Sequence, residues 1–294
     1  MPRLRSRSRR RGGWGRRILN WVAGLIVGFV VLSLLWVLLY KWVNPPYSFT
    51  MLGDRLQGRN VARAWMPVGQ IDRDMVRAAI AAEDSKFCAH WGFDEDAIAA
   101  AMKRNARGGN VIRGGSTISQ QTAKNAFLWQ GGGYVRKGLE AWFTLLIENI
   151  WGKRRIMEVY LNLAETGLGT YGANAGSQRY FGHDASNLSR VEAARIAAVL
   201  PLPKKRGAVA PKGFTRRYGN MIAARIPVVA GNGLDACVYR SGPAPAERPE
   251  PRPRKAAPQP AQQPVPGEEL EQPQAAPAPE APAPEAPPES SNGA

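Results

Sequence analysis

The sequence predicts a mostly α-helical domain that follows a single membrane-spanning helix. Two observations carry this prediction: residues 18–40 form an uncharged apolar run, and residues 44–240 contain frequent helix signals and few strand signals. A third observation limits the domain, because residues 241–294 hold 16 of the 24 prolines. A chain of 294 residues is long enough for one large domain or two ordinary ones, and this distribution favours one.

The N-terminus has the features of an uncleaved signal anchor. Residues 1–17 contain eight arginines and no acidic residue, and the 23 uncharged residues that follow match the thickness of a bilayer. The bulky residues Leu39 to Trp42 do not fit a signal-peptide cleavage site, which needs small side chains. We therefore expect residues 1–17 in the cytoplasm, a transmembrane segment over 18–43 and the rest across the membrane. A buried core helix, or a nucleic-acid-binding arm at the arginines, explains this arrangement less well.

The net charge of +17 is distributed unevenly. Residues 241–294 carry a net charge of −4, whereas residues 18–240 carry +13, which indicates an anionic partner for the middle section. The proline-rich tail at 241–294 is too poor in apolar side chains to offset chain entropy, so we expect it to be disordered and assign it no function.

The cysteine and histidine counts exclude several classes of protein. Two cysteines without a Cys-x-x-Cys pair exclude a structural zinc site and a disulfide-dense mini-protein. Only two histidines are present, His90 and His183, which argues against a metal centre built from histidine.

Residues 44–240 are expected to form one domain with at least six helices. The indications are apolar spacing, acidic residues at a helix start, a capping box and a stop at Pro201. The expected helices are 73–84, 93–105, 117–127, 134–151, 154–163 and 189–200. Glycines mark two loops, at 107–115 and 130–133.

Glu83 is the first candidate for chemistry. It follows the apolar stretch Ala78–Ala82 and precedes a loop that contains Phe87 and His90. Partial burial at such a position would raise the carboxyl pKa, which a general acid or base working near neutrality requires. From the local pattern alone, a solvated loop acid is the simpler interpretation.

The second candidate is the stretch Gly114–Asn125. A glycine-rich loop that opens a helix offers free N–H groups to an anion. Thr117, Gln121 and Lys124 are spaced four and three residues apart, so they share a helix face with side chains suited to phosphate or sugar. An ordinary capped polar helix is the alternative.

The third candidate combines Arg136 and Lys137 with Glu140. Arg136 and Glu140 fit a surface pair at i,i+4. In a catalytic interpretation the two cations bind a phosphate and Glu140 supplies a second carboxylate, because two carboxylates at a glycosidic centre are what acetal chemistry needs. A fourth stretch, at 169–172 and 180–182, is more typical of a structural turn and core than of a site.

Taken in order, these segments resemble the motifs of the peptidoglycan glycosyltransferases, in particular the monofunctional members. The pattern E-D-x-x-F-x-x-H-x-G occurs at 83–92, and G-G-S-T-I-S/T-Q-Q-x-x-K-N at 114–125. R-K-x-x-E follows at 136–140, and the helix motif ending in E-x-Y-L-N at 152–162. The resemblance covers residues 65–225, and four ordered motifs are far more specific than any one of them.

The resemblance implies a lysozyme-like catalytic domain in the bacterial inner membrane. It implies polymerisation of lipid II into β-1,4-linked glycan, with release of undecaprenyl diphosphate and inversion at the anomeric carbon. By position, Glu83 matches the general base and Glu140 the second glutamate, near the donor diphosphate. Lys124, Arg136 and Lys137 match the cations that hold this diphosphate. The other matching positions, which would contact substrate, are Phe87, His90, Ser116, Thr117, Gln120, Gln121 and Asn125. For His90 a structural or orienting role fits better than that of a base.

The resemblance also implies partners and cofactors. We expect lipid II, the lipid-linked strand and the membrane as partners, other cell-wall synthesis or division proteins as candidates, and no nucleic acid. A Mg²⁺ or Mn²⁺ ion on the diphosphate fits the analogy, although no ligand set in the sequence indicates one. Bifunctional relatives carry Ser-x-x-Lys and Lys-Thr-Gly motifs, and because this chain has neither, we expect a monofunctional enzyme.

Two questions stay open at this point. Cys88 and Cys237 would both face an oxidising periplasm, and a disulfide between them is a hypothesis that the sequence does not decide. The sequence also does not indicate which of Lys204, Lys205 and Arg206 reaches the substrate.

Two other functions compete with synthesis. A lytic enzyme that cleaves peptidoglycan would share the fold and a catalytic glutamate, but it would not need Lys124, Arg136 and Lys137. A non-catalytic, membrane-anchored scaffold that binds the cell wall would use the positive charge but would tolerate the loss of Glu83.

Overall fold

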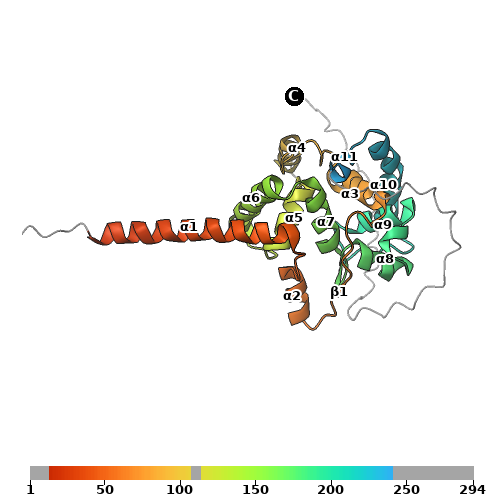
Figure 1. Ribbon diagram of the computed structural model, residues 1–294. Helices are drawn as coiled ribbons and strands as arrows, with labels where there is room; N and C mark the ends of the chain where they lie inside the picture. Colours follow the sequence, from red (N-terminus) through yellow and green to blue (C-terminus); the bar gives the residue numbers. More distant parts are fainter. Residues whose placement is uncertain (1–12, 107–113, 241–294) are drawn as a thin grey trace, which may run out of the picture. The chain divides into compact units, whose positions relative to one another are not determined.

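The computed structural model describes residues 13–106 and 114–240 (Figure 1). Most of the arginine-rich start, most of the first glycine loop and the whole predicted tail lie outside the described residues. The helices are α1 (Gly13–Trp42), α2 (Phe49–Leu56), α3 (Arg73–Glu83), α4 (Glu95–Ala106), α5 (Ile118–Phe127), α6 (Gly133–Ile150), α7 (Lys153–Leu163), α8 (Ala173–Phe181), η1 (Ala185–Asn187), α9 (Arg190–Val199), α10 (Gly213–Gly231) and α11 (Ala236–Tyr239). The strands are β1 (Ala62–Arg63), β2 (Glu165–Gly167) and β3 (Thr170–Tyr171).

Helix α1 is long and apolar enough to cross a membrane, and it is the only such helix in the described ranges. Most of its apolar side chains are exposed, as expected of a helix that faces lipid. Its C-terminal half packs against α6, where the Trp142 indole donates a hydrogen bond to Ser33 Oγ at 3.0 Å. The Trp151 indole donates to the carbonyl of Val37 at 2.7 Å. α1 is therefore compatible with a single-pass anchor that is attached closely to the domain.

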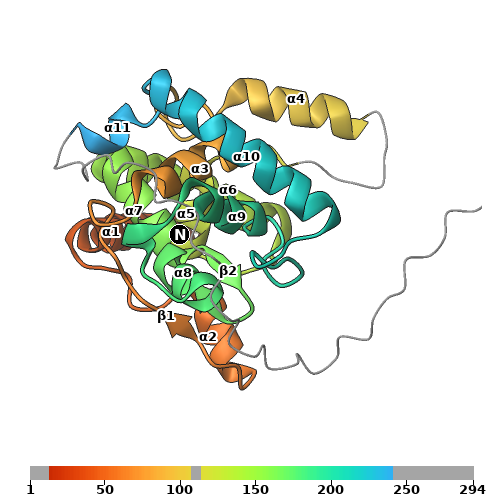
Figure 2. The ribbon, with the colours of Figure 1, turned by 90° about the vertical axis from the view of Figure 1, so that its right-hand side faces the viewer.

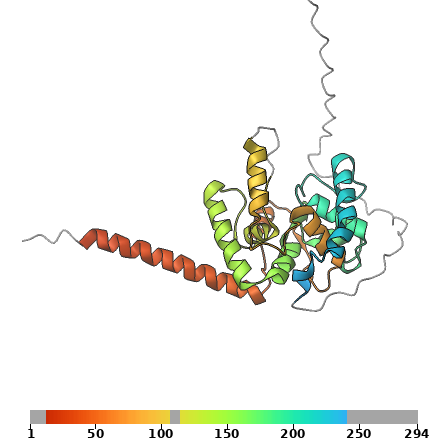
Figure 3. The ribbon, with the colours of Figure 1, turned by 90° about the horizontal axis from the view of Figure 1, so that it is seen from above.

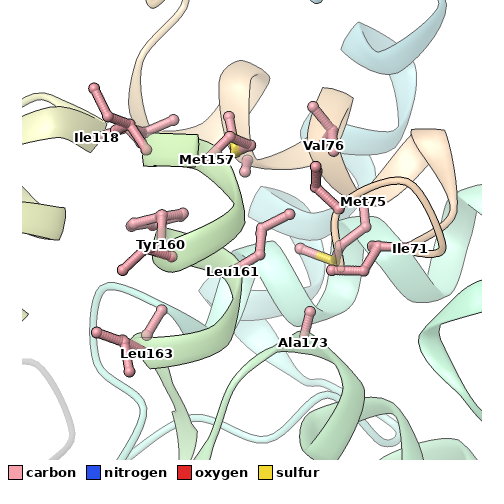
Figure 4. Close-up of a cluster of buried hydrophobic side chains, with 14 of the residues drawn as sticks. Ile71, Met75, Val76, Ile118, Met157, Tyr160, Leu161, Leu163 and Ala173 are labelled. Carbon is pink, nitrogen blue, oxygen red and sulfur yellow. The ribbon is translucent and has the colours of Figure 1, made fainter. Parts of the chain in front are cut away.

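Helix α5 is central to the core because it packs against both α6 and α7. Phe127 of α5 stacks on Phe143 of α6, with ring centroids 4.6 Å apart. Around α7, Tyr160 and Leu161 lie among buried side chains contributed by α3, α5 and α8 (Figure 4). Burial of each large apolar side chain stabilises the fold by about 1.5–3 kcal/mol.

Helices α3, α9 and α10 pack together as a second group of the same fold (Figures 2 and 3). A capping box between Ser189 and Glu192 starts α9. The loop after α3 is cross-linked to α11 by a disulfide between Cys88 and Cys237, whose Cα atoms are 5.5 Å apart. The disulfide hypothesis is therefore confirmed, and the end of the described fold is attached next to the Glu83 loop.

A small three-stranded sheet has the order β1-β3-β2. β1 pairs with β3 in parallel, Ala62 opposite Thr170, and β2 pairs with β3 in antiparallel. Gly169 precedes β3 with φ +65°, and a Cβ there would lie 2.4 Å from the carbonyl oxygen of Asn60. This close approach requires glycine, so the sheet depends on a residue without a side chain.

The predicted mostly α-helical fold is confirmed, and all six expected helices are present as α3–α7 and α9. The capping box of Thr117 and Gln120 is also present. The short helix α2, helices α8, α10 and α11, and the small sheet were not expected. Strands of two or three residues carry too little periodicity to be detected, and long-range pairing defines them.

Candidate active site

Glu83 lies at the C-terminal end of α3, where the following residue Asp84 leaves the helical conformation with φ −158°. Its Oε2 atom accepts a hydrogen bond from the Gln121 amide of α5 at 2.8 Å. Its Oε1 atom is buried and has no hydrogen-bond partner among the described residues. Burial raises the pKa of the Glu83 carboxyl, and the neighbouring negative charge of Asp84 raises it further, while the Gln121 hydrogen bond acts in the opposite direction. Glu83 is thus a carboxylate with a raised pKa, and its Oε1 atom is free to accept a hydrogen bond.

Asp84 holds the surroundings of Glu83 in place, a role that the sequence analysis did not assign. Its carboxylate accepts a hydrogen bond from His90 Nε2 at 3.0 Å and from the backbone N–H of Ile118 at 3.0 Å. The second bond places a negative charge at the N-terminus of α5, where the helix dipole favours it. The adjacent E-D pair was visible in the sequence, but its partners lie 6 and 34 residues away.

His90 is engaged at both ring nitrogens. Nδ1 accepts the backbone N–H of Gly92 at 3.1 Å, and this assignment leaves Nε2 as the donor to Asp84. Gly92 has φ +86°, and a Cβ there would lie 2.7 Å from Thr144 Cγ2, so only glycine fits this turn. These contacts support the orienting role for His90.

Three of the residues expected to bind substrate are committed to the fold instead. Phe87 is fully buried in the core, with the Lys153 ammonium 4.7 Å from its ring centroid. Thr117 caps α5 and donates to the carbonyl of Gly92 at 2.6 Å, and Gln120 completes the capping box. A motif letter does not tell which way a side chain points. In this structure the three side chains support the fold, and their contact with substrate stays a prediction.

Lys124 lies on α5, one turn after Gln121. Lys124 and its neighbour Asn125 are both half-buried. Burial lowers the pKa of the Lys124 ammonium, and the charges of Arg136 and Lys137 lower it further. The carboxylates of Glu140 and Glu83 both act in the opposite direction. Lys124 therefore interacts electrostatically with both glutamates and connects them into one site.

Glu140 is held between two cations of its own helix. Arg136 Nη1 donates to Glu140 Oε2 at 2.7 Å, and the Lys137 ammonium contacts the other carboxylate oxygen. Only 3% of Glu140 is exposed, so the interpretation as an ordinary surface pair is wrong. Lys137 also donates to Ser116 Oγ at 3.3 Å, which links the start of α5 to this cluster. The structure thus gathers the second and third sequence candidates around one carboxylate.

Arg206 and Tyr218 complete the surroundings of Glu83. The positive charge of Arg206 opposes the rise of the Glu83 pKa, whereas Lys204 faces Asp54 at 3.5 Å on the small-sheet side. The Tyr218 hydroxyl donates to the carbonyl of Ala82 at 3.0 Å, directly before Glu83. The sequence indicated Arg206 as one of three basic candidates after Pro203, but no sequence pattern indicated a role for Tyr218.

Within residues 13–106 and 114–240, the side chains do not build a protein-held metal site. In the part of the chain that the structure describes, no group of three or more His, Cys, Asp and Glu side chains could hold a metal ion. The Glu140 carboxylate is already paired with Arg136 and Lys137. No step of the reaction is therefore assigned to a metal ion that the protein holds. A Mg²⁺ or Mn²⁺ ion carried by the substrate stays a prediction.

Comparison with known proteins identifies the family of this chain. A family model described as Transglycosylase matches residues 50–226, which include both glutamates. The chain is 46% identical to a biosynthetic peptidoglycan transglycosylase of Caulobacter vibrioides, over 77% of this chain and 99% of the relative. Proteins with the same name from Rhodospirillum centenum and Pseudomonas putida are also 46% identical, over 76% and 73% of this chain and 96% and 93% of their own lengths.

Proposed function

The chain belongs to the transglycosylase family and is a peptidoglycan glycosyltransferase, and on that premise we propose that it polymerises lipid II. The donor would be a lipid-linked strand and the acceptor a lipid II molecule. The product would be a β-1,4-linked glycan strand, formed with inversion at the anomeric carbon.

Glu83 is the general base of this proposal. Its free Oε1 takes the proton from the 4-hydroxyl of the acceptor while the oxygen forms a bond to the anomeric carbon of the donor. The bond between that carbon and the phosphate oxygen breaks, and undecaprenyl diphosphate leaves with the electron pair. A carboxyl whose pKa burial has raised is a stronger base for this transfer than an exposed glutamate.

The leaving diphosphate would be stabilised by Lys124, Arg136 and Lys137. Fixed cations stabilise charge as it develops, without reorganisation during the step. Glu140 orients Arg136 and Lys137, since both contact its carboxylate. The different surroundings of the two glutamates are the single observation that carries the assignment of roles.

The lytic alternative is less well supported. Cleavage of a finished glycan releases no diphosphate, so it gives no reason for three cations around the second glutamate. The names of the three relatives above also refer to biosynthesis. The non-catalytic scaffold is set aside, because the family is enzymatic.

We also propose the location and partners of the enzyme. α1 would be its single anchor in the bacterial inner membrane, with the N-terminus cytoplasmic and the catalytic domain periplasmic. Other cell-wall synthesis proteins would act beside it, and a divalent ion, if used, would arrive on the diphosphate.

Polymerisation of labelled lipid II by the purified full-length chain tests the proposal. We expect a polymer that a muramidase degrades, and we expect Glu83→Gln to lower the rate by about 10²–10⁴-fold, because the general base is lost. Glu95→Gln on the exposed start of α4 is the matched control and should polymerise normally. Normal polymerisation by Glu83→Gln would refute the base assignment, and cleavage of preformed glycan without synthesis would favour the lytic enzyme.

A further inference from the structure

Tyr160 on α7 is a buried polar group that the mechanism above does not use. Only 1% of it is exposed, and its hydroxyl has no hydrogen-bond partner within residues 13–106 and 114–240. Nearly all buried polar groups in native proteins have a hydrogen-bond partner, so such a group calls for an explanation. Tyr160 belongs to the E-x-Y-L-N motif, whose neighbours Glu158 and Asn162 do have partners, in the backbone N–H groups of Val68 and Met66.

The free oxygen of Glu83 is the complementary group. Glu83 Oε1 is a buried acceptor without a donor, and the Tyr160 hydroxyl is a buried donor without an acceptor. Tyr160 lies on α7, which packs against α5, and α5 carries both Ile118, which donates to Asp84, and Gln121, which donates to Glu83. The charges of Glu83 and Asp84 both act on the Tyr160 hydroxyl.

Other nearby groups are already engaged. The Asp84 carboxylate is occupied by His90 and the Ile118 N–H, and Tyr218 donates to Ala82. The polar and charged groups that face Glu83 come from several elements and are Asp84, Gln121, Lys124, Tyr160, Arg206 and Tyr218. Among these, Tyr160 alone has a hydroxyl that no group in the described ranges accepts.

We propose that Tyr160 is a positioning residue for Glu83, and that in the working enzyme its hydroxyl donates to one water molecule that donates in turn to Glu83 Oε1. This inference rests on the proposed role of Glu83 as the base. A bridging water needs polar partners in a buried space, and these two atoms supply them.

The tyrosine stays a donor throughout the reaction. Burial raises the pKa of the Tyr160 hydroxyl well above its usual range, so it does not ionise at the working pH. The proton taken from the acceptor goes to Glu83, and Tyr160 neither gains nor loses one. Its effect is to stabilise the charged form of Glu83 and to orient Oε1 toward the acceptor.

The pH dependence of kcat/KM for Tyr160→Phe tests the proposal. Loss of a donor to the charged carboxylate raises its pKa, so we expect the acidic limb to move to higher pH by about one unit. Most of the activity should return above the new limb, where Glu83 is ionised again. A site-specific 3-fluorotyrosine at position 160 keeps the shape and is a stronger donor, so it should move the limb to lower pH.

Tyr239→Phe is the matched control. The Tyr239 hydroxyl is also buried and without a hydrogen-bond partner in the described ranges, but it lies beside Arg73 and Asp235 instead of Glu83. Its pH profile should superimpose on that of the wild type, and thermal melts report the stability of each variant. A Tyr160→Phe profile that superimposes on the wild type, or an equal change in Tyr239→Phe, overturns the proposal.

The failure of this inference is distinguishable from failure of the proposed function. If Glu83→Gln is inactive and neither Tyr160 variant moves the acidic limb, only the role of Tyr160 is wrong. If Glu83→Gln polymerises normally, the base assignment itself is wrong and the inference fails with it.

Discussion

The two glutamates of the site have the same side chain and opposite surroundings. Glu83 ends a helix, receives one hydrogen bond from a neutral amide and keeps one oxygen free. Glu140 lies inside a helix, and a cation contacts each of its oxygens. The first arrangement leaves a carboxylate able to accept a proton, whereas the second fixes two cations in space. The difference indicates that residue type alone does not assign a role, because the neighbours decide it.

Glu140→Gln should have the largest effect among the variants that keep Glu83. Arg136 and Lys137 would lose the carboxylate that holds them, and we expect the rate of polymerisation to fall by about 10²–10³-fold. The acidic limb of the pH profile should stay in place, because Glu83 is unchanged. Steady-state kinetics with lipid II measure both quantities.

Glu158→Gln is the control for that variant, because Glu158 pairs with Arg155 at 2.5 Å in the same i,i+3 spacing on α7. A loss of rate in Glu158→Gln equal to that in Glu140→Gln would mean that the ion pair matters only for the fold.

Lys124→Met tests the connection between the two glutamates. Loss of a cation at the diphosphate should lower kcat/KM by about 10–10²-fold. The positive charge of Lys124 also opposes the rise of the Glu83 pKa, so its removal should move the acidic limb to higher pH. Lys103→Met, at an exposed position of α4, is the control. If the acidic limb of Lys124→Met does not move, the charge of Lys124 does not influence the pKa of Glu83.

Gln121→Leu should have the smallest effect and concerns Glu83 alone. The Gln121 amide donates to the charged carboxylate and so lowers its pKa. Without this bond the pKa of Glu83 rises, so we expect the acidic limb to move to higher pH by about one unit. The pH profile of kcat/KM measures it, and a limb that moves to lower pH would contradict the assigned hydrogen bond.

The helices that carry the site could be predicted because their signals are local. The capping box of α5 and the i,i+3 and i,i+4 spacing around Glu140 are contained within a few residues. Helix α10 was not predicted, and it contains Gly219 and Pro227, which interrupt a helical pattern. The small sheet was missed because Ala62 pairs with Thr170, more than a hundred residues away.

The parts of the site that depend on distant contacts could not be predicted. Asp84 meets Ile118, and Tyr218 meets Ala82, across sequence separations of 34 and 136 residues. The motif letters identified Phe87 and Thr117 as members of the pattern, but burial decides that their side chains support the fold. The order of the motifs thus identified segments that the structure brings together, but it could not orient every side chain within them.

The disulfide between Cys88 and Cys237 also bears on the topology of the chain across the membrane. Disulfides persist in oxidising compartments, and cytosolic thiols are kept reduced. The arginines before α1 favour the cytoplasmic side through their charge. The disulfide and the arginines are independent features of the chain. Both support the proposed topology, with the N-terminus in the cytoplasm and the domain in the periplasm. If the proposed topology is right, a reductant that does not cross the inner membrane should reach this bond in whole cells.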